Sequence, residues 1–103
     1  MIDLVGVTGF DWDADNARKN DKHDVSTAEA EQVFFNAPLL LLEDESHSHS
    51  HSQSEIRLHV LGQTDVGRGL HITFTLRQAG TLIRVISARD LHRKERAIYD
   101  QAD

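Results

Sequence analysis

Three consecutive segments of the chain, residues 55–62, 70–77 and 82–87, carry apolar side chains at alternating positions. The middle segment shows the pattern most clearly, because Leu70, Ile72, Phe74 and Leu76 alternate with His71, Thr73, Thr75 and Arg77. Side chains two residues apart lie on the same face of a β-strand, so each segment would have one apolar and one polar face. Turns around Gly67 and Gly80 separate the segments. The sequence therefore predicts a three-stranded antiparallel meander.

Two helices are predicted ahead of this meander. The first covers about residues 14–23 and follows Asp13, whose carboxylate can accept hydrogen bonds from the first turn. Its thin buried side would consist of Ala14, Ala17 and Asn20. A helix that is polar nearly all round depends on its neighbours for stability.

The second helix has a clearer start signal. In Ser26-Thr27-Ala28-Glu29 the serine hydroxyl can reach the third amide while the glutamate reaches back, which is a capping box. Val25 and Ala30 flank this box as a hydrophobic staple. The helix is expected to run to about Asn36, since Pro38 prevents its continuation.

The remaining elements complete an α+β domain. Short strands are predicted over residues 2–7 and 39–42, and a last helix over about residues 90–102 would turn Leu91, Ala97, Ile98 and Ala102 inward. We expect one domain over residues 1–103, with an antiparallel sheet of about four strands, two N-terminal helices and one C-terminal helix. A chain of this length buries only about two-thirds of its unfolded surface, so it has one modest core.

The net charge of −6 is unevenly distributed. Residues 1–55 carry −9, whereas residues 56–103 carry +3 and every arginine except Arg18. This asymmetry indicates a local anion-binding surface, although the arginines could instead pair with the acidic half. The chain has no cysteine, no apolar run near the ~20 residues of a membrane span and no visible secretory signal. We therefore expect a cytoplasmic protein without membrane contact.

Residues 43–54 form a histidine- and serine-rich stretch that we predict to be a flexible loop. His47, His49 and His51 could chelate zinc, nickel or copper from one face of an extended segment. A defined site also needs ordered supporting contacts, which serine spacers do not supply, so a flexible repeat without metal is the alternative interpretation. The sequence contains neither a phosphate-binding glycine loop nor a nucleophile elbow.

The C-terminal segment carries the groups that a metal-independent ribonuclease uses. Arg89, His92, Arg93 and Arg96 would share one helix face, beside Glu95 and Tyr99. Such groups can move the 2′-hydroxyl proton, hold the scissile phosphate and protonate the leaving oxygen. A solvated helix face is the alternative interpretation, and Lys22-His23 could likewise only complement a helix dipole.

The order and spacing of motifs from Phe10 to Tyr99 resemble those of the BrnT family, the toxin halves of bacterial type II toxin–antitoxin pairs. The matching positions are Phe10-Asp11-Trp12-Asp13, Asn20, Lys22-His23-Asp24-Val25-Ser26, Glu29-Ala30, Val33-Phe34, Pro38, Asp44, His51-Ser52, Glu55, Arg57, Gly62, Gly67-Arg68, Thr75, Arg77, Ile83-Arg84-Val85-Ile86-Ser87-Ala88-Arg89, Glu95-Arg96 and Tyr99. Asp24 departs from the family's glycine, and residues 47–50 look like an expansion of the His-Ser step. A helix end often requires a left-handed residue, which aspartate tolerates less well than glycine.

The resemblance implies a RelE-like fold and a ribonuclease that cleaves RNA without metal or organic cofactor and halts translation. It also implies a BrnA-like ribbon-helix-helix antitoxin, which would supply any DNA contact, in a homodimer or a toxin–antitoxin heterotetramer. The alternative is an inactive toxin fold that only binds the antitoxin and regulates the operon.

The candidate catalytic residues fall into three groups. Arg57, Arg89 and Arg96 are candidates for phosphate binding. Lys22, His23 and Glu95 are candidates for proton transfer, and Arg93 and Tyr99 are further candidates with no assigned role.

Overall fold

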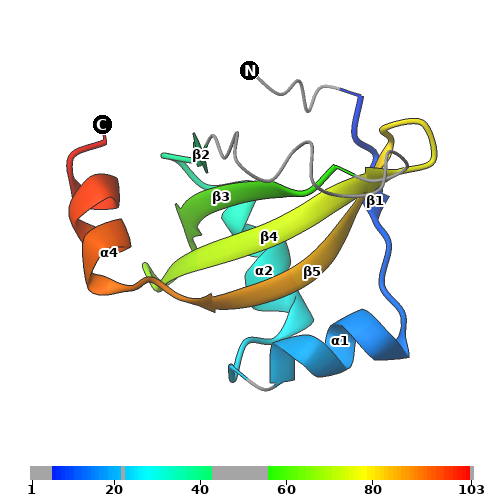
Figure 1. Ribbon diagram of the computed structural model, residues 1–103, viewed down its shortest axis with the longest axis horizontal. Coiled ribbons are helices and arrows are strands. Elements are labelled where there is room, and N and C mark those ends of the chain that lie inside the picture. Colours follow the sequence, from blue (N-terminus) through cyan, green and yellow to red (C-terminus); the bar gives the residue numbers. More distant parts are fainter. Residues whose placement is uncertain (1–5, 22, 43–55, 103) are drawn as a thin grey trace.

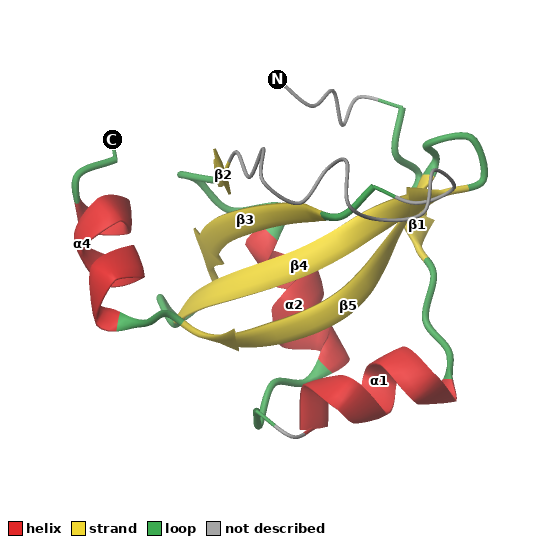
Figure 2. Ribbon diagram, viewed as in Figure 1, coloured by secondary structure: helices red, strands yellow, loops and turns green. Residues whose placement is uncertain are grey.

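The computed structural model describes residues 6–21, 23–42 and 56–102. Their elements follow in the order β1 (Gly9–Phe10), α1 (Ala14–Asp21), α2 (Thr27–Val33), β2 (Leu40–Leu42), β3 (Leu58–Gln63), β4 (Gly69–Arg77), β5 (Leu82–Asp90) and α4 (Arg93–Asp100). Helix α2 crosses one face of the sheet, whereas α4 lies beyond the end at which β4 begins (Figure 1). Helices and strands thus share one α+β domain (Figure 2).

The sheet has five strands in the order β1-β5-β4-β3-β2, not the four that the sequence predicts. The meander β3-β4-β5 and the β2–β3 pair are antiparallel, as expected, but β1 runs parallel to β5 and pairs Gly9 with Leu82. The predicted strand over residues 2–7 is wrong at Val7, which lies outside any strand, and residues 2–5 lie outside the described part. A two-residue edge strand is too short to leave an alternating pattern, so sequence reasoning missed it.

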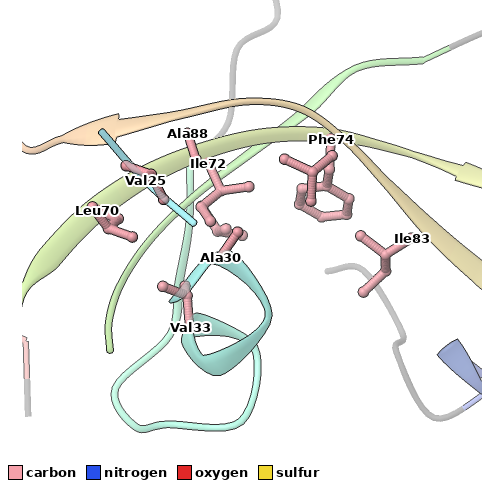
Figure 3. Packing of buried hydrophobic residues seen from close by; sticks show 10 residues of the cluster. Val25, Ala30, Val33, Leu70, Ile72, Phe74, Ile83 and Ala88 are labelled. Carbon is pink, nitrogen blue, oxygen red and sulfur yellow. The ribbon is translucent and has the colours of Figure 1, made fainter. Parts of the chain in front are cut away.

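The core lies between the sheet and helix α2 (Figure 3). The predicted apolar faces of β3, β4 and β5 supply most of it, together with the inward side of α2. Its buried members are Val25, Ala30, Val33, Val60, Leu70, Ile72, Phe74, Ile83, Val85 and Ala88. The alternation in the sequence therefore assigns the buried face of β4 correctly, and the opposite face of β4 carries His71 and Thr73. In the first segment it is wrong at Ile56, which precedes β3 and is 61% exposed, and Leu61 is buried on the opposite face, where it pairs with His71.

Helix α2 confirms its predicted start. The Ser26 hydroxyl accepts a hydrogen bond from the Glu29 amide at 3.1 Å, and the Glu29 carboxylate accepts one from the Ser26 amide at 3.0 Å. The helix ends at Val33 rather than near Asn36, with Phe34 as its C-cap. Val25 and Ala30, the predicted staple, are both buried. Asp24 adopts φ 59°, so the position where the family has glycine does require a left-handed backbone.

Helix α1 is attached to the sheet by a polar side chain instead of the predicted alanines. Ala14 is exposed, whereas Asn16 is only 3% exposed. The Asn16 amide donates to the carbonyls of Asp11 and Val85, at 2.9 and 3.1 Å, and its oxygen accepts from the Asp13 amide at 2.7 Å. An amide that makes all these bonds can be buried at little cost, and hydropathy patterns do not detect it. The side chain of Asn20 lies outside the described part.

The C-terminal region also differs from expectation. Strand β5 extends to Asp90, past the predicted end at residue 87, because its last three residues, 88–90, still pair with β4. Helix α4 buries Tyr99, while Ala97 and Ile98 face solvent. The prediction is therefore wrong for Ala97 and Ile98, whereas Leu91 and Ala102 are half-buried. Of the helices that the structure describes, none has the length and apolar character needed to cross a membrane.

Arg68 joins four segments at one end of the sheet. Its guanidinium donates to Asp90 at 2.8 Å, to Glu29 at 3.1 Å and to the Asp24 carbonyl at 2.9 Å. The β3–β4 turn is thus fixed to the end of β5, to the capping box of α2 and to the left-handed residue before that box. The Arg68 guanidinium holds the pKa values of the Asp90 and Glu29 carboxyls below their ordinary range, although the capping bond from Ser26 is the larger cause for Glu29.

Removal of Arg68 is expected to destabilise the fold. Arg68→Ala should lower the free energy of unfolding by roughly 2 kcal/mol, since hydrogen bonds to charged groups contribute about 1.5–3 kcal/mol and partial exposure reduces the total. Urea denaturation followed by circular dichroism measures this change. Arg18→Ala, at an exposed position of α1, is the matched control and should leave the midpoint unchanged. Equal midpoints for both variants would contradict the role of Arg68.

Candidate active site

The polar face of the sheet brings four ionisable side chains together. The strand register places His71 of β4 opposite Arg89 of β5, and His59 of β3 opposite Thr73 of β4. Directly paired residues lie on the same side of a sheet, so these side chains form two adjacent rows on the face opposite α2. Glu95, in the first turn of α4, reaches the same rows. We call His59, His71, Arg89 and Glu95 the histidine cluster.

The two histidines of the cluster contact each other directly. His59 Nδ1 lies 3.2 Å from His71 Nε2, and the ring centroids are 5.3 Å apart. The Thr73 hydroxyl lies 3.0 Å from the same His59 Nδ1. The second nitrogen of His71, Nδ1, contacts Arg89 Nη2 and lies 2.9 Å from Glu95 Oε2. Each nitrogen of His71 therefore has a polar neighbour, which fixes the orientation of its ring.

Arg89 and Glu95 form a two-bond ion pair behind His71. Arg89 Nη1 and Nη2 donate to Glu95 Oε1 and Oε2 at 2.8 and 2.9 Å. The same carboxylate accepts a bond from the His92 amide at 2.9 Å, which caps the start of α4. The side chains of Glu95 and His71 are 16% and 13% exposed, so water screens these interactions little.

This environment changes the protonation of both groups. The hydrogen bond from Arg89 is the largest cause that lowers the pKa of Glu95 to about 2, with the His92 amide contributing further. Burial lowers the pKa of His71, and the nearby Arg89 charge lowers it too, whereas Glu95 acts in the opposite direction. Near neutral pH, Glu95 is therefore ionised and His71 is neutral.

Two exposed arginines flank the histidine cluster along the strand direction. Arg57 is exposed and lies immediately before β3, two residues ahead of His59. At the other end, a Cβ added to Gly69 would lie 2.7 Å from Arg96 Nη2, which shows that this guanidinium covers Gly69. Gly69 precedes His71 by two residues on the same face of β4. The side chain of Arg96 is 48% exposed and lies 3.7 Å from Asp100.

Among the predicted site residues, Arg89 and Glu95 are in direct contact within the cluster, and Arg57 and Arg96 lie on opposite sides of it. Arg93 is exposed in the first turn of α4. His23 is exposed in the turn before α2, where its carbonyl lies 3.5 Å from Arg68 Nη2.

Two further predictions concern residues with other surroundings. Tyr99 is buried, its hydroxyl donates to the Pro38 carbonyl at 2.7 Å, and burial raises its pKa. Lys22 and the histidine-rich stretch over residues 43–54 lie outside the described residues. Within the described part, no group of three or more histidine or carboxylate side chains is arranged to hold a metal ion.

Sequence reasoning missed His59 and His71 as site residues. Both occur at polar positions of strongly alternating strands, where the pattern predicts only a side chain that faces away from the core. Two paired strands each carry a histidine at a polar position, and this repetition is the signal that could have indicated the site. The strand register needed to bring the two together does not follow from alternation alone.

Comparison with known families gives a consistent assignment. The sequence matches the model of a family described as the ribonuclease toxin BrnT of type II toxin–antitoxin systems, over residues 12–95. That match covers most of the chain and every member of the histidine cluster, and the protein belongs to the BrnT family. A type II system consists of a toxin and a protein antitoxin, so an antitoxin partner is implied. A search of curated proteins gave no significant match.

The Glu95 carboxylate makes an acid-sensitive contribution to stability. Its pKa in the folded protein, about 2, lies below the ordinary 4.5, so its contribution is complete above about pH 4.5 and is lost as the pH falls toward 2. Glu95→Gln should lower the free energy of unfolding by about 1–3 kcal/mol near neutral pH and much less at about pH 2. Urea denaturation across this range measures the difference.

Asp100→Asn is the control for this experiment, because Asp100 is an exposed carboxylate on the same helix. It should leave the acid dependence of the wild type unchanged. A constant difference between wild type and Glu95→Gln at all pH values would contradict the pKa assignment.

Proposed function

We propose that this protein is an RNA endonuclease toxin that inhibits translation and is neutralised by a BrnA-like antitoxin. The observation that carries the proposal is the histidine cluster, which lies on the sheet face opposite α2 in a chain of a ribonuclease toxin family. Imidazole groups are suited to proton transfer near neutral pH, and here two of them are in direct contact.

The chemistry we propose is a transesterification within the RNA strand. His59 takes the proton of a 2′-hydroxyl, the O2′–P bond forms and the P–O5′ bond breaks. The imidazolium then gives this proton to O5′, which leaves a 2′,3′-cyclic phosphate and a 5′-hydroxyl. All atoms and protons balance without a second reactant. His71, at 3.2 Å, and the Thr73 hydroxyl, at 3.0 Å, both contact His59 Nδ1 and help to hold its ring in place.

Phosphate binding is the second requirement of this reaction. Arg57 and Arg96 flank the histidine cluster along the strands, and Arg93 adds an exposed charge at the start of α4. Guanidinium groups bind phosphate oxygens through two parallel hydrogen bonds. We assign to these arginines the binding of the scissile phosphate and of its neighbours along the strand.

The antitoxin would provide the other half of the system. A ribbon-helix-helix antitoxin of the BrnA type would cover the toxin, and DNA binding to their operon would occur through the antitoxin alone. An acidic toxin chain is compatible with this arrangement, because it does not itself contact DNA.

RNA cleavage by purified variants tests the proposal. His59→Ala and His71→Ala should each reduce cleavage by about 10²–10⁴-fold, the range typical of a lost proton-transfer group. The products of the wild type should carry a cyclic phosphate, detected by mass spectrometry. His92→Ala removes an exposed histidine outside the cluster and should cleave at the wild-type rate.

Two results would overturn this function. Either the wild-type protein leaves RNA intact, or both cluster variants cleave it as fast as the wild type. In cells, induction without the antitoxin should arrest growth, and co-expression of the antitoxin should restore it. Normal growth in the absence of the antitoxin would favour a protein that only binds its partner.

Salt dependence tests the phosphate-binding assignment separately. Loss of one phosphate contact to a single strand lowers the slope of log affinity against log salt by about 0.7. Arg57→Ala and Arg96→Ala should each show this decrease and raise KM with little change in kcat. Arg18→Ala, on the acidic side of the molecule, should keep the wild-type slope. Unchanged slopes in the first two variants would remove Arg57 and Arg96 from the RNA-binding surface.

A further inference from the structure

We infer that Arg89 and Glu95 are positioning residues that act through His71. Both contact His71 Nδ1, Arg89 as a hydrogen-bond donor and Glu95 as an acceptor, and they thereby control which nitrogen of His59 carries the proton. This inference rests on the proposed function, because it concerns the protons that the same cluster moves. It assigns to Arg89 a role other than the phosphate binding that the sequence predicts.

The hydrogen bonds of Arg89 are directed into the protein. A guanidinium has five N–H donors. Four of its bonds go to protein acceptors: the two oxygens of Glu95, the Asp90 carbonyl at 3.0 Å and His71 Nδ1. A phosphate would have to displace these contacts and leave the Glu95 carboxylate uncompensated. Arg89 is therefore built to hold neighbouring side chains, while Arg57 and Arg96 remain the exposed cations on either side.

His71 Nδ1 lies between a donor and an acceptor. Arg89 can only donate, because its guanidinium stays protonated, and ionised Glu95 can only accept. Contact with Arg89 therefore requires a lone pair on Nδ1, whereas contact with Glu95 Oε2 at 2.9 Å requires a proton there. The cluster can therefore adopt two hydrogen-bond arrangements, which differ in the direction of donation between His71 and its neighbours.

In the first arrangement, Arg89 donates to His71 Nδ1, and His71 Nε2–H donates to His59 Nδ1. Neutral His59 then carries its proton on Nε2, so this nitrogen cannot act as the base. In the second arrangement, His59 Nδ1–H donates to His71 Nε2, and His71 Nδ1–H donates to Glu95. Neutral His59 then has a lone pair on Nε2 and can accept the 2′-hydroxyl proton, and the imidazolium that forms returns this proton to O5′. Arg89 and Glu95 thus determine, through His71, whether His59 can act as the base.

Among the described residues, three ionisable side chains act on the titration of His71: Arg89 on β5, Glu95 on α4 and His59 on β3. Arg89 and Glu95 act on the pKa of His71 in opposite directions, downward and upward. Removal of either one should therefore shift this pKa in the direction set by the other. The tautomer of His71 then shows which of the two hydrogen bonds its Nδ1 makes.

NMR titration of the histidine rings in the intact protein tests this inference without RNA. Arg89→Gln should raise the apparent pKa of His71, and Glu95→Gln should lower it further. The ¹⁵N shifts of neutral His71 should show the proton on Nδ1 in Arg89→Gln, where Glu95 is the remaining partner, and on Nε2 in Glu95→Gln, where Arg89 is the remaining partner. Arg84→Gln is the matched control: Arg84 is also on β5, but it pairs with Asp11 and Asp13. It should leave the His71 titration unchanged.

The outcomes are distinct. Shifts of the His71 pKa in opposite directions support the inference, whereas shifts in the same direction, or none in either variant, overturn it. Circular dichroism identifies a variant that fails to fold, and Arg89→Met, which also removes the charge, then replaces Arg89→Gln with the same expected rise in the His71 pKa.

Cleavage kinetics provide a second readout if the wild type is active. Both variants should lower kcat by about tenfold or more and shift the pH profile of kcat in opposite directions, with KM nearly unchanged. A rise in KM alone for Arg89→Gln would mean that Arg89 binds phosphate and would overturn the inference. Absence of cleavage in the wild type would refute the proposed function and still leave the titration as a test of the hydrogen-bonding arrangement.

Discussion

The carboxylate of Glu95 is the interaction on which the C-terminal half of the molecule depends. It accepts the His92 amide at the start of α4, compensates the half-buried charge of Arg89 and contacts His71. A neutral group in its place would leave Arg89 buried beside a lowered-pKa histidine without a counter-charge, which is costly in a poorly solvated site. One side chain therefore both caps helix α4 and balances the charges of the histidine cluster. Arg68 likewise serves several elements, since its guanidinium joins α2, the β3–β4 turn and the end of β5.

The distribution of charge looks different once the internal pairs are known. Arg68 and Arg84 pair with carboxylates from the acidic first half, and Arg89 pairs within the second half. The interpretation that arginines pair with the acidic half is thus confirmed for Arg68 and Arg84, whereas the anion-binding surface stays a prediction. Among the described residues, Arg57, Arg93, Lys94 and Arg96 face solvent on or near α4 and β3. With a net charge of −6, long-range attraction of RNA would be weak, so the proposed binding would depend on contacts at short range.

The elements that the sequence predicts well are those fixed by local chemistry. The capping box at Ser26 and the alternation along β4 place α2 and the core correctly, because each depends on residues a few positions apart. Asn16 and Tyr99 illustrate what local patterns miss: both are buried through hydrogen bonds to carbonyls distant in sequence, at Val85 and Pro38. For the site, Arg89 and Glu95 were predicted with other roles, and the histidines were not predicted. Their contact depends on strand register, which alternation leaves open.

The order of the elements along the chain has a consequence for biosynthesis. Strand β1 comes first but pairs with β5, and Glu95 follows every strand. During translation the sheet therefore cannot be closed before β5 has emerged from the ribosome, nor the histidine cluster completed before Glu95 has emerged. The time at which His59, His71, Arg89 and Glu95 meet is thus set by the topology of the sheet and by the position of α4 after it.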